Sequence, residues 1–149
     1  MTRSPTVHAS AVLAGARAVL IRGPSGAGKS RLALALLAAA TDGRLAFARL
    51  VGDDRCHLEA QHGRLLVRPA AELAGLIEVH GLGIRRLAYE PAAVVGLVVD
   101  LAAADAARMP ADAAGRTNIA GIEVLRLAVA PDTDPLPLVL AALATEPAT

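Results

Sequence analysis

The sequence predicts an α/β fold with a P-loop NTPase-like core, in which a mixed β-sheet is flanked by a few helices. The first observation is that residues 23–30 fit the pattern G-x-x-x-x-G-K-[ST] of a phosphate-binding loop. The second is the apolar run Ala18–Ile21 before this loop, which is typical of a strand. The third is the run of strong helix formers from Arg31 to Ala38 after it. Strand, glycine-rich loop and helix, in this order, form the context in which the pattern binds phosphate.

The loop predicts where a nucleoside triphosphate and Mg²⁺ bind. Its glycines let backbone N–H groups surround a phosphate, and the following helix directs its positive N-terminus to the same place. Lys29 is expected to reach the β- and γ-phosphates, and Ser30 to ligate Mg²⁺. The alternative is a glycine-rich turn that binds nothing. The predicted nucleotide-binding residues are Gly23, Pro24, Ser25, Gly26, Ala27, Gly28, Lys29 and Ser30.

Length and composition limit the possible number of domains, the kind of core and the classes of partner. A chain of 149 residues is expected to form one domain, residues 1–149. With 54% hydrophobic but only 1% aromatic residues, its core has to be aliphatic. The net charge of +1 gives no general attraction to nucleic acid or to membranes. Cys56 is the only cysteine, which excludes an internal disulfide, and no segment is typical of a membrane span, so a soluble cytoplasmic protein is expected.

The other elements follow from local patterns. Apolar alternation around glycine turns predicts two hairpins, with strands at 7–13 and 18–22 and at 56–60 and 64–68. The helix after the loop is expected to run from Lys29 or Ser30 to about Ala40. Further strands are predicted at 49–52, 92–100 and within 119–129. Short helices are predicted at 69–74, 102–108 and 138–144, the last one after a proline- and aspartate-rich loop at 131–137.

Asp53 and Asp54 follow the predicted strand 49–52. A strand-end carboxylate beside a phosphate loop can hold Mg²⁺ or handle the proton of the attacking nucleophile. Because neighbouring side chains on extended backbone point to opposite sides, one is expected to face the metal and phosphates, and the other the structure or the second substrate. The alternative is a polar turn. Asp100, at the end of the apolar run 92–100, competes for the same role and fits it better by pattern alone.

Pattern alone leaves two more residues open. Glu78 lies in an apolar run followed by two glycines, and it is either a half-exposed strand residue or a metal-site carboxylate. His8 lies on the first predicted strand, near the loop, where an ordinary strand histidine is the simpler interpretation.

Four landmarks in one order resemble the catalytic domain of the bacterial HPr kinase/phosphorylase family: His8, the loop 23–30, Asp53-Asp54 and the segment 77–84. That family carries a His-Gly before its loop, a Val-Ala-Asp-Asp after the loop helix and a Glu-Ile-Arg-Gly-Leu-Gly-Ile signature. The resemblance covers essentially the whole chain. It implies a phosphoenolpyruvate-carboxykinase-like fold and a homo-oligomer, commonly a hexamer. It also implies transfer of the γ-phosphoryl group of ATP to a serine of HPr, the small phosphocarrier of the phosphotransferase system.

The resemblance also implies roles for individual residues. Lys29 is the loop lysine, and Ser30 and Glu78 are Mg²⁺ ligands, with Asp53 beside them at the strand end. Asp54 is the general base for the serine hydroxyl and the acid in the reverse direction. His8 becomes a supporting active-site residue, and Asp100 becomes structural.

The sequence departs from the family pattern at several positions. Ala9, Gly52 and His80 replace a glycine, an alanine and an arginine. Arg108 is the candidate for an arginine that the family uses further on. Where the family has a basic Pro-Gly-Arg loop tied to dephosphorylation, this chain has the acidic segment 131–135. Because an acidic loop repels inorganic phosphate, kinase activity with weak or absent phosphorylase activity is predicted.

Two other functions remain open on the sequence. A P-loop kinase for a small-molecule hydroxyl could use the same site without a protein acceptor. A nucleotide-sensing module could bind ATP and a partner without transferring phosphate, and His80 and the acidic segment 131–135 keep that alternative open.

Overall fold

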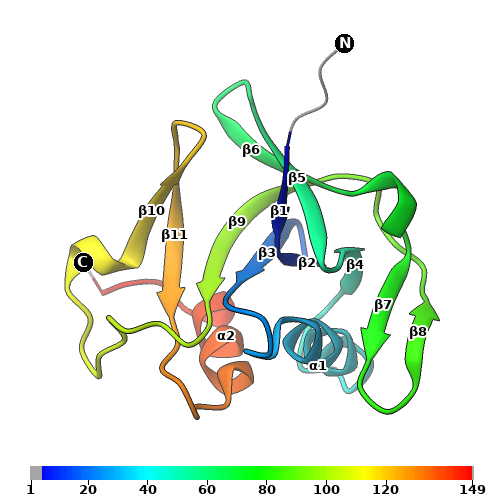
Figure 1. Cartoon of the computed structure of the whole chain (residues 1–149). Coiled ribbons are helices and arrows are strands. Elements are labelled where there is room, and N and C mark those ends of the chain that lie inside the picture. Colours follow the sequence, from blue (N-terminus) through cyan, green and yellow to red (C-terminus); the bar gives the residue numbers. More distant parts are fainter. Residues whose placement is uncertain (1–4, 149) are drawn as a thin grey trace.

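The computed structural model describes residues 5–148, and strands dominate this part of the chain (Figure 1). Two α-helices are present in it, α1 (Lys29–Thr41) and α2 (Pro135–Ala144), with single 3₁₀ turns at Ala71–Leu73 and Asp112–Gly115. The strands are β1 (Thr6–His8), β2 (Ser10–Ala14), β3 (Arg17–Arg22), β4 (Ala48–Gly52), β5 (Arg55–Gln61), β6 (Arg64–Pro69), β7 (Leu76–Val79), β8 (Gly83–Arg86), β9 (Ala93–Asp100), β10 (Arg116–Ile119) and β11 (Ile122–Ala128).

Most of these strands form one sheet that is branched at β9. Its main path runs β1-β5-β6-β9-β3-β2-β4. One side of β9 pairs with β3. On its other side, β6 pairs antiparallel with the start of β9, and β11 pairs parallel with its end. β10 then pairs antiparallel with β11, and β7 and β8 form a separate hairpin. The sheet is largely antiparallel, and Figure 1 shows it curling like half of a barrel.

A parallel segment of three strands lies within this sheet. β3 and β11 both run parallel to β9, and Arg22 and Ala128 are each in register with Asp100 at the end of β9. The carboxyl ends of the three strands therefore meet at one edge of the sheet. The segments that continue from β3, β9 and β11 begin side by side there.

The core has two parts, one on each face of the sheet. On one face the helix residues Leu32, Leu36 and Val139 pack against strand residues such as Ile21 and Val99. α1 and α2 lie together below the sheet in Figure 1. On the other face the cluster contains no helix residue, because the curled sheet packs on itself: Ala9, Ala11, Ala18, Leu20, Val51, Cys56, Leu65, Val67, Val95, Val98 and Val124.

The predicted α/β class with a P-loop NTPase-like core is wrong. Such a core needs helices on both faces of a mainly parallel sheet, because crossover helices connect parallel strands. Here the described residues hold two helices, both on one face, and the other face is covered by β5 and β6 of the same sheet. Hairpin connections therefore dominate where the prediction required helical crossovers.

Most local predictions are confirmed, with three corrections. The hairpin of β2 and β3, the helix α1, the hairpin of β5 and β6 and the buried strand β9 lie where the patterns indicate. The first predicted strand is split, because Thr6–His8 pairs with β5 instead of β3. The helix predicted at 102–108 is wrong, since this segment is a series of turns.

The last correction concerns α2, which begins at Pro135 instead of Leu138. The Asp134 carboxylate accepts a hydrogen bond from the Leu136 backbone N–H at 3.2 Å, and Pro135 occupies the first helical position. Both features favour a helix start at this point. Neither helix of residues 5–148 has the length and apolar character needed to cross a membrane.

Candidate functional site

The glycine-rich loop connects β3 to α1 and has a backbone that only glycine adopts easily at two positions. Gly26 has φ +82° and Gly28, which precedes the first residue of α1, has φ +102°. A side chain at either position would be strained, whatever the space around it. The Ala27 N–H donates to the Pro24 carbonyl at 3.0 Å and tightens the turn. The sequence pattern thus corresponds to a compact loop at the N-terminus of a helix.

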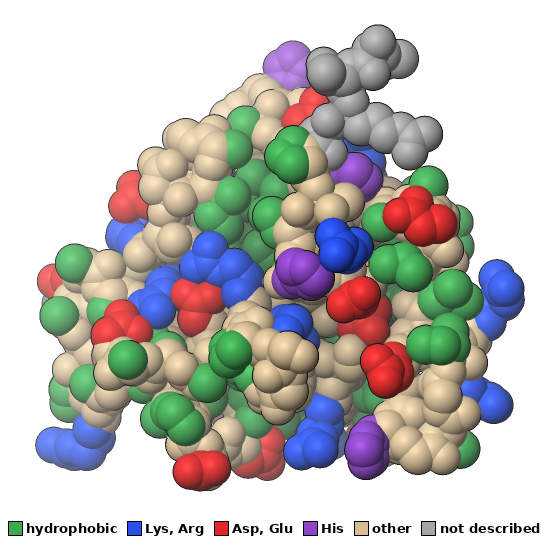
Figure 2. All heavy atoms as spheres, viewed as in Figure 1, with side chains coloured by type: hydrophobic (Ala, Val, Ile, Leu, Met, Phe, Trp, Pro, Cys, Tyr) green, Lys and Arg blue, Asp and Glu red, His purple; other side chains and the backbone are tan. Residues whose placement is uncertain are grey.

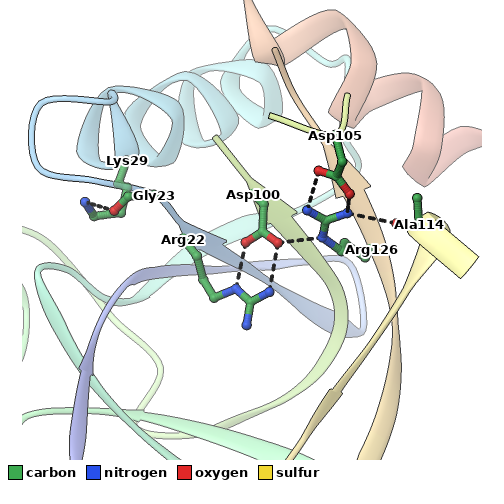
Figure 3. Close-up of polar contacts among 7 residues, drawn as sticks. All are labelled: Arg22, Gly23, Lys29, Asp100, Asp105, Ala114 and Arg126. Atoms are coloured by element: carbon green, nitrogen blue, oxygen red, sulfur yellow. Dashed lines mark hydrogen bonds and ion pairs between the residues drawn. The ribbon is translucent and has the colours of Figure 1, made fainter. Parts of the chain in front are cut away.

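Lys29 folds back onto this loop. Its ammonium donates to the Gly23 carbonyl at 2.9 Å (Figure 3) and to the Pro24 carbonyl at 3.2 Å. Lys29 is also the only lysine in the sequence. The chain therefore has one side-chain ammonium group, and it lies against the start of the glycine-rich loop.

Asp53 is a buried carboxylate that joins three elements around the loop. It follows β4, and only 4% of the residue is exposed. Its Oδ1 accepts from Ser10 Oγ of β2 at 2.5 Å, and both of its oxygens lie 2.8 Å from Ser30 Oγ of α1. Its Oδ2 accepts the Glu78 N–H of β7 at 3.3 Å. These donors hold the carboxylate in a fixed orientation beside the loop.

Asp54 occupies a different environment from its neighbour. Its backbone is left-handed, with φ +68°, and its side chain is 68% exposed. His8 lies beside it, with His8 Nδ1 at 4.0 Å from Asp54 Oδ1. The Ala9 N–H also donates to the Asp54 carbonyl at 3.3 Å, which ties the end of β1 to this turn. The two adjacent aspartates thus differ in environment. Asp53 is buried against Ser30, whereas Asp54 is exposed to solvent beside His8.

Figure 2 shows that charged and histidine side chains gather on the face where β1 and β2 approach α1. The structure brings together His8, Ser30, Asp53 and Asp54 in this region. Glu78 joins them through its backbone N–H, while its side chain is exposed. Arg108 lies in the exposed segment after β9 and makes no hydrogen bond or ion pair within residues 5–148. Ser10 is the site residue that the sequence analysis missed, because no motif marks an isolated strand serine.

The oxygen donors around Asp53 fit the chemistry of Mg²⁺. The carboxylate and the Ser30 hydroxyl are hard oxygen ligands, and Mg²⁺ is usually held by one or two protein oxygens together with substrate phosphates and water. No group of three or more histidine, cysteine or acidic side chains gathers around a point in residues 5–148. A carboxylate and a hydroxyl of this kind are the protein ligands that suit a magnesium ion shared with a phosphate.

Cys56 lies under the same turn, and its thiol is unreactive near neutral pH. Burial, together with the nearby Asp53 and Asp54 carboxylates, raises the pKa of its thiol to about 12. Its Sγ donates to the Ala9 carbonyl at 3.4 Å. Because the nucleophilic form of cysteine is the thiolate, Cys56 is excluded as a nucleophile near neutral pH.

A second polar cluster lies where the three parallel strands end (Figure 3). Asp100 accepts from Arg22 Nε at 2.7 Å and from Arg126 Nε at 2.6 Å. Arg126 also donates to Asp105 at 2.8 Å and to the Ala114 carbonyl at 3.0 Å. Burial alone would raise the pKa of Asp100, but the hydrogen bonds from the two arginines outweigh it and hold this pKa below its ordinary value. The hydrogen bonds that Arg126 donates to Asp105 and Asp100 in turn raise the pKa of Arg126.

These contacts occupy both Asp100 oxygens with arginines. Asp100 is therefore bound to guanidinium groups, whereas Asp53 contacts Ser30 of the loop helix. The geometry favours Asp53 over Asp100 as the carboxylate that lies in place to act together with the glycine-rich loop.

Replacing Asp100 by asparagine is expected to lower the free energy of unfolding by about 2–3 kcal/mol, since hydrogen bonds to charged groups are lost and two arginines lose their counter-charge. The check is urea unfolding followed by circular dichroism. Asp105→Asn is the control, with a smaller expected effect because the Asp105 side chain is 53% exposed.

The stabilisation by Asp100 also has a predicted pH dependence. The pKa of Asp100 is lower in the folded state than its ordinary 3.8, so its contribution is complete above that value. This contribution to stability is lost as the pH falls below 3.8 toward the folded-state pKa of Asp100. The difference in unfolding free energy between wild type and Asp100→Asn should therefore become smaller at such pH values. Equal unfolding midpoints for the two proteins at neutral pH would contradict the role assigned to this cluster.

Comparison with solved structures finds a likeness that extends over almost the whole chain. The structure matches that of the HPr(Ser) kinase/phosphatase from Coxiella burnetii, with a TM-score of 0.73 and 26% sequence identity. The match covers 95% of this chain and 95% of that chain. No protein-family model and no curated protein matches the sequence. On the structural match, the chain is related to the HPr kinase/phosphorylase proteins at the level of the family.

Proposed function

We propose that this chain is an ATP-dependent serine kinase that phosphorylates an HPr-type phosphocarrier protein, with residues 1–149 forming a single catalytic domain. The observation that carries the proposal is the separation of the two adjacent aspartates. Asp53 is buried and bonded to Ser30 beside the loop, whereas Asp54 is exposed beside His8. A kinase needs both kinds of carboxylate, one for the metal and phosphates and one for the proton of the acceptor.

The loop 23–30 supplies the site for ATP in this proposal. Backbone N–H groups at the start of α1 face a phosphate favourably, and Lys29 offers a positive charge at the same place. Ser30 and Asp53 hold Mg²⁺, with the Glu78 side chain as a further candidate ligand. Bound there, Mg²⁺ supplies neutralisation of the charge on the β- and γ-phosphates. The hydrogen bonds that fix Asp53 orient it before the substrate arrives.

Asp54 acts as the general base for the acceptor serine. Its carboxylate takes the proton of the serine hydroxyl, the serine oxygen forms a bond to the γ-phosphorus, and the bond to the β-phosphate oxygen breaks to release ADP. The exposure of Asp54 suits an acceptor that is itself a protein, because a serine on a folded partner can reach it only from outside. His8 supports Asp54 from 4.0 Å. Arg108, on its exposed loop, remains a candidate for contact with the transferred group.

ADP release in the presence and absence of acceptors tests the function. The protein and MgATP are combined with an HPr-type phosphocarrier, with small-molecule alcohols, or with no acceptor. Release that depends on the carrier supports the proposal. Release that depends only on a small molecule favours a metabolite kinase, and ATP binding without release in any mixture favours a nucleotide-sensing module. The homo-oligomer implied by the family remains a prediction, which light scattering can check.

The acidic segment 131–135 gives a separate prediction about the reverse reaction. Asp132 lines a cavity of about 220 Å³ together with Gly26 and Ala27 of the loop, so the acidic segment lies beside the proposed phosphate site. Negative charge there opposes the approach of inorganic phosphate. Phosphoserine-HPr and inorganic phosphate are therefore expected to yield little or no pyrophosphate in an enzymatic pyrophosphate assay. Release at a rate comparable to the kinase reaction would contradict this prediction.

A further inference from the structure

The segment after β11 lies next to the glycine-rich loop because of the strand directions. β3, β9 and β11 run parallel, and their carboxyl ends share one edge of the sheet. The loop 23–28 continues from β3, and the segment 129–134 leads from β11 into α2. The two segments therefore form opposite sides of one region in front of the parallel strands.

A cavity of about 530 Å³ lies between them. Its volume is within the range of small-molecule sites, roughly 300–1,000 Å³. The α1 side contributes Arg31, Leu32 and Ala35, and the other side contributes Asp132, Thr133 and Leu136. Gly28 of the loop also lines it. The cavity thus combines aliphatic walls with a few polar groups and opens beside the place where phosphates are proposed to bind.

Asp132 is the carboxylate of this cavity that is free to bind a ligand. The Asp134 carboxylate accepts the Leu136 N–H at the start of α2 and so has a structural partner. Asp132 is exposed, and within residues 5–148 its side chain makes no hydrogen bond or ion pair. Its backbone is left-handed, with φ +64°, a conformation that aspartate tolerates better than most residues. This turn places Asp132 among the residues that line the cavity on the side facing α1.

We propose that this cavity binds the nucleoside part of ATP, and that Asp132 accepts hydrogen bonds from the ribose hydroxyls. The base packs between the aliphatic side chains of α1 and Leu136, because these walls offer apolar surface to a flat ring. A carboxylate is the partner that suits vicinal hydroxyls, since it accepts two hydrogen bonds and donates none. The inference rests on the proposed function and adds the group that makes the site specific for a ribonucleotide.

Calorimetric titration of three probes tests it: MgATP, Mg-2′,3′-dideoxy-ATP and magnesium tripolyphosphate. Wild type is expected to bind ATP at least about tenfold more tightly than dideoxy-ATP, because hydrogen bonds to a charged acceptor are lost. Asp132→Gly, which tolerates the left-handed backbone, should bind both nucleotides alike, and it should bind tripolyphosphate at least as tightly as wild type does. Asp112→Ala removes the same charge at an exposed position outside both cavities, and it should retain the preference of wild type.

The outcomes separate the two proposals. If Asp132→Gly keeps the preference for ATP over dideoxy-ATP, or if wild type binds tripolyphosphate as tightly as ATP, the nucleoside site is overturned while the phosphate site stands. If wild type binds none of the three probes, the proposed function fails and the nucleoside site fails with it. Ala35→Phe, which fills the cavity from α1, provides a second variant and should weaken ATP binding without changing tripolyphosphate binding.

Discussion

A protein with alanine in place of Lys29 is expected to lose MgATP binding and phosphotransfer together, with transfer reduced about 10²–10³-fold. Lys29 is the only side-chain ammonium in the chain, and it bonds to the carbonyls of Gly23 and Pro24 at the mouth of the loop. No other lysine can substitute for it. A bound polyphosphate would compete for this charge, because a phosphate oxygen is a stronger partner for an ammonium group than a carbonyl.

The uniqueness of Lys29 allows a direct measurement. An amine-acylating reagent can modify Lys29 and the N-terminal amine, and mass spectrometry of peptides resolves the two sites. MgATP should protect Lys29 while the N-terminal amine serves as the internal reference. Arg64→Ala removes a positive charge from an exposed hairpin and is the matched control for Lys29→Ala. Equal labelling of Lys29 with and without MgATP, or unchanged activity of Lys29→Ala, would contradict the site.

Replacing Asp54 by asparagine is expected to reduce phosphotransfer about 10²–10⁴-fold, the usual contribution of a general base. ATP binding should be unchanged, because the Asp54 side chain is exposed beside His8 and accepts no hydrogen bond from Ser30 or Lys29. Asparagine tolerates the left-handed backbone at φ +68°, so the turn should be preserved. The substitution is therefore expected to lower kcat and to leave the affinity for ATP unchanged.

Steady-state kinetics with the carrier and calorimetry with MgATP check this prediction side by side. Asp112→Asn, a neutralised aspartate on a distant exposed turn, serves as the control and should behave as wild type. Asp53→Asn provides the contrast, because it changes a buried carboxylate that bonds Ser10 and Ser30 and should impair stability and binding as well. If Asp54→Asn transferred phosphate at the rate of wild type, Asp54 could not be the base.

The sequence predicted the local features of the structure well, namely its glycine-rich loop, its first helix and its hairpins. The glycine pattern before a run of helix formers gave the loop and α1, and glycine turns gave the hairpins of β2 with β3 and β5 with β6. The apolar run 92–100 gave β9. The supporting active-site role of His8, which the family resemblance implies, stays a prediction, and the structure places His8 Nδ1 at 4.0 Å from Asp54 Oδ1. These features depend on residues close in sequence or on an ordered set of motifs.

The fold class could not be obtained in the same way. The hairpins already present in the sequence indicated antiparallel pairing, but the loop pattern favoured an α/β core. What decides the class is how the sheet curls, so that Leu65 and Val67 of β6 cover the face that a helix would otherwise cover. That packing depends on contacts between distant segments, as does the bond between Ser10 and Asp53, which are 43 residues apart. The same holds for Arg22 and Arg126, whose pairing with Asp100 follows from strand order and not from any motif.

The most direct test of the central claim follows the γ-phosphoryl group of ATP onto the carrier. An HPr-type phosphocarrier is incubated with the protein and ATP labelled at the γ-position, and the labelled residue is identified by peptide mass spectrometry. The account predicts label on one serine with wild type and a strong loss of label with Asp54→Asn, although both proteins bind ATP. Absence of label on the carrier with a wild-type protein that binds ATP would contradict the assignment of this chain as a serine kinase for a phosphocarrier.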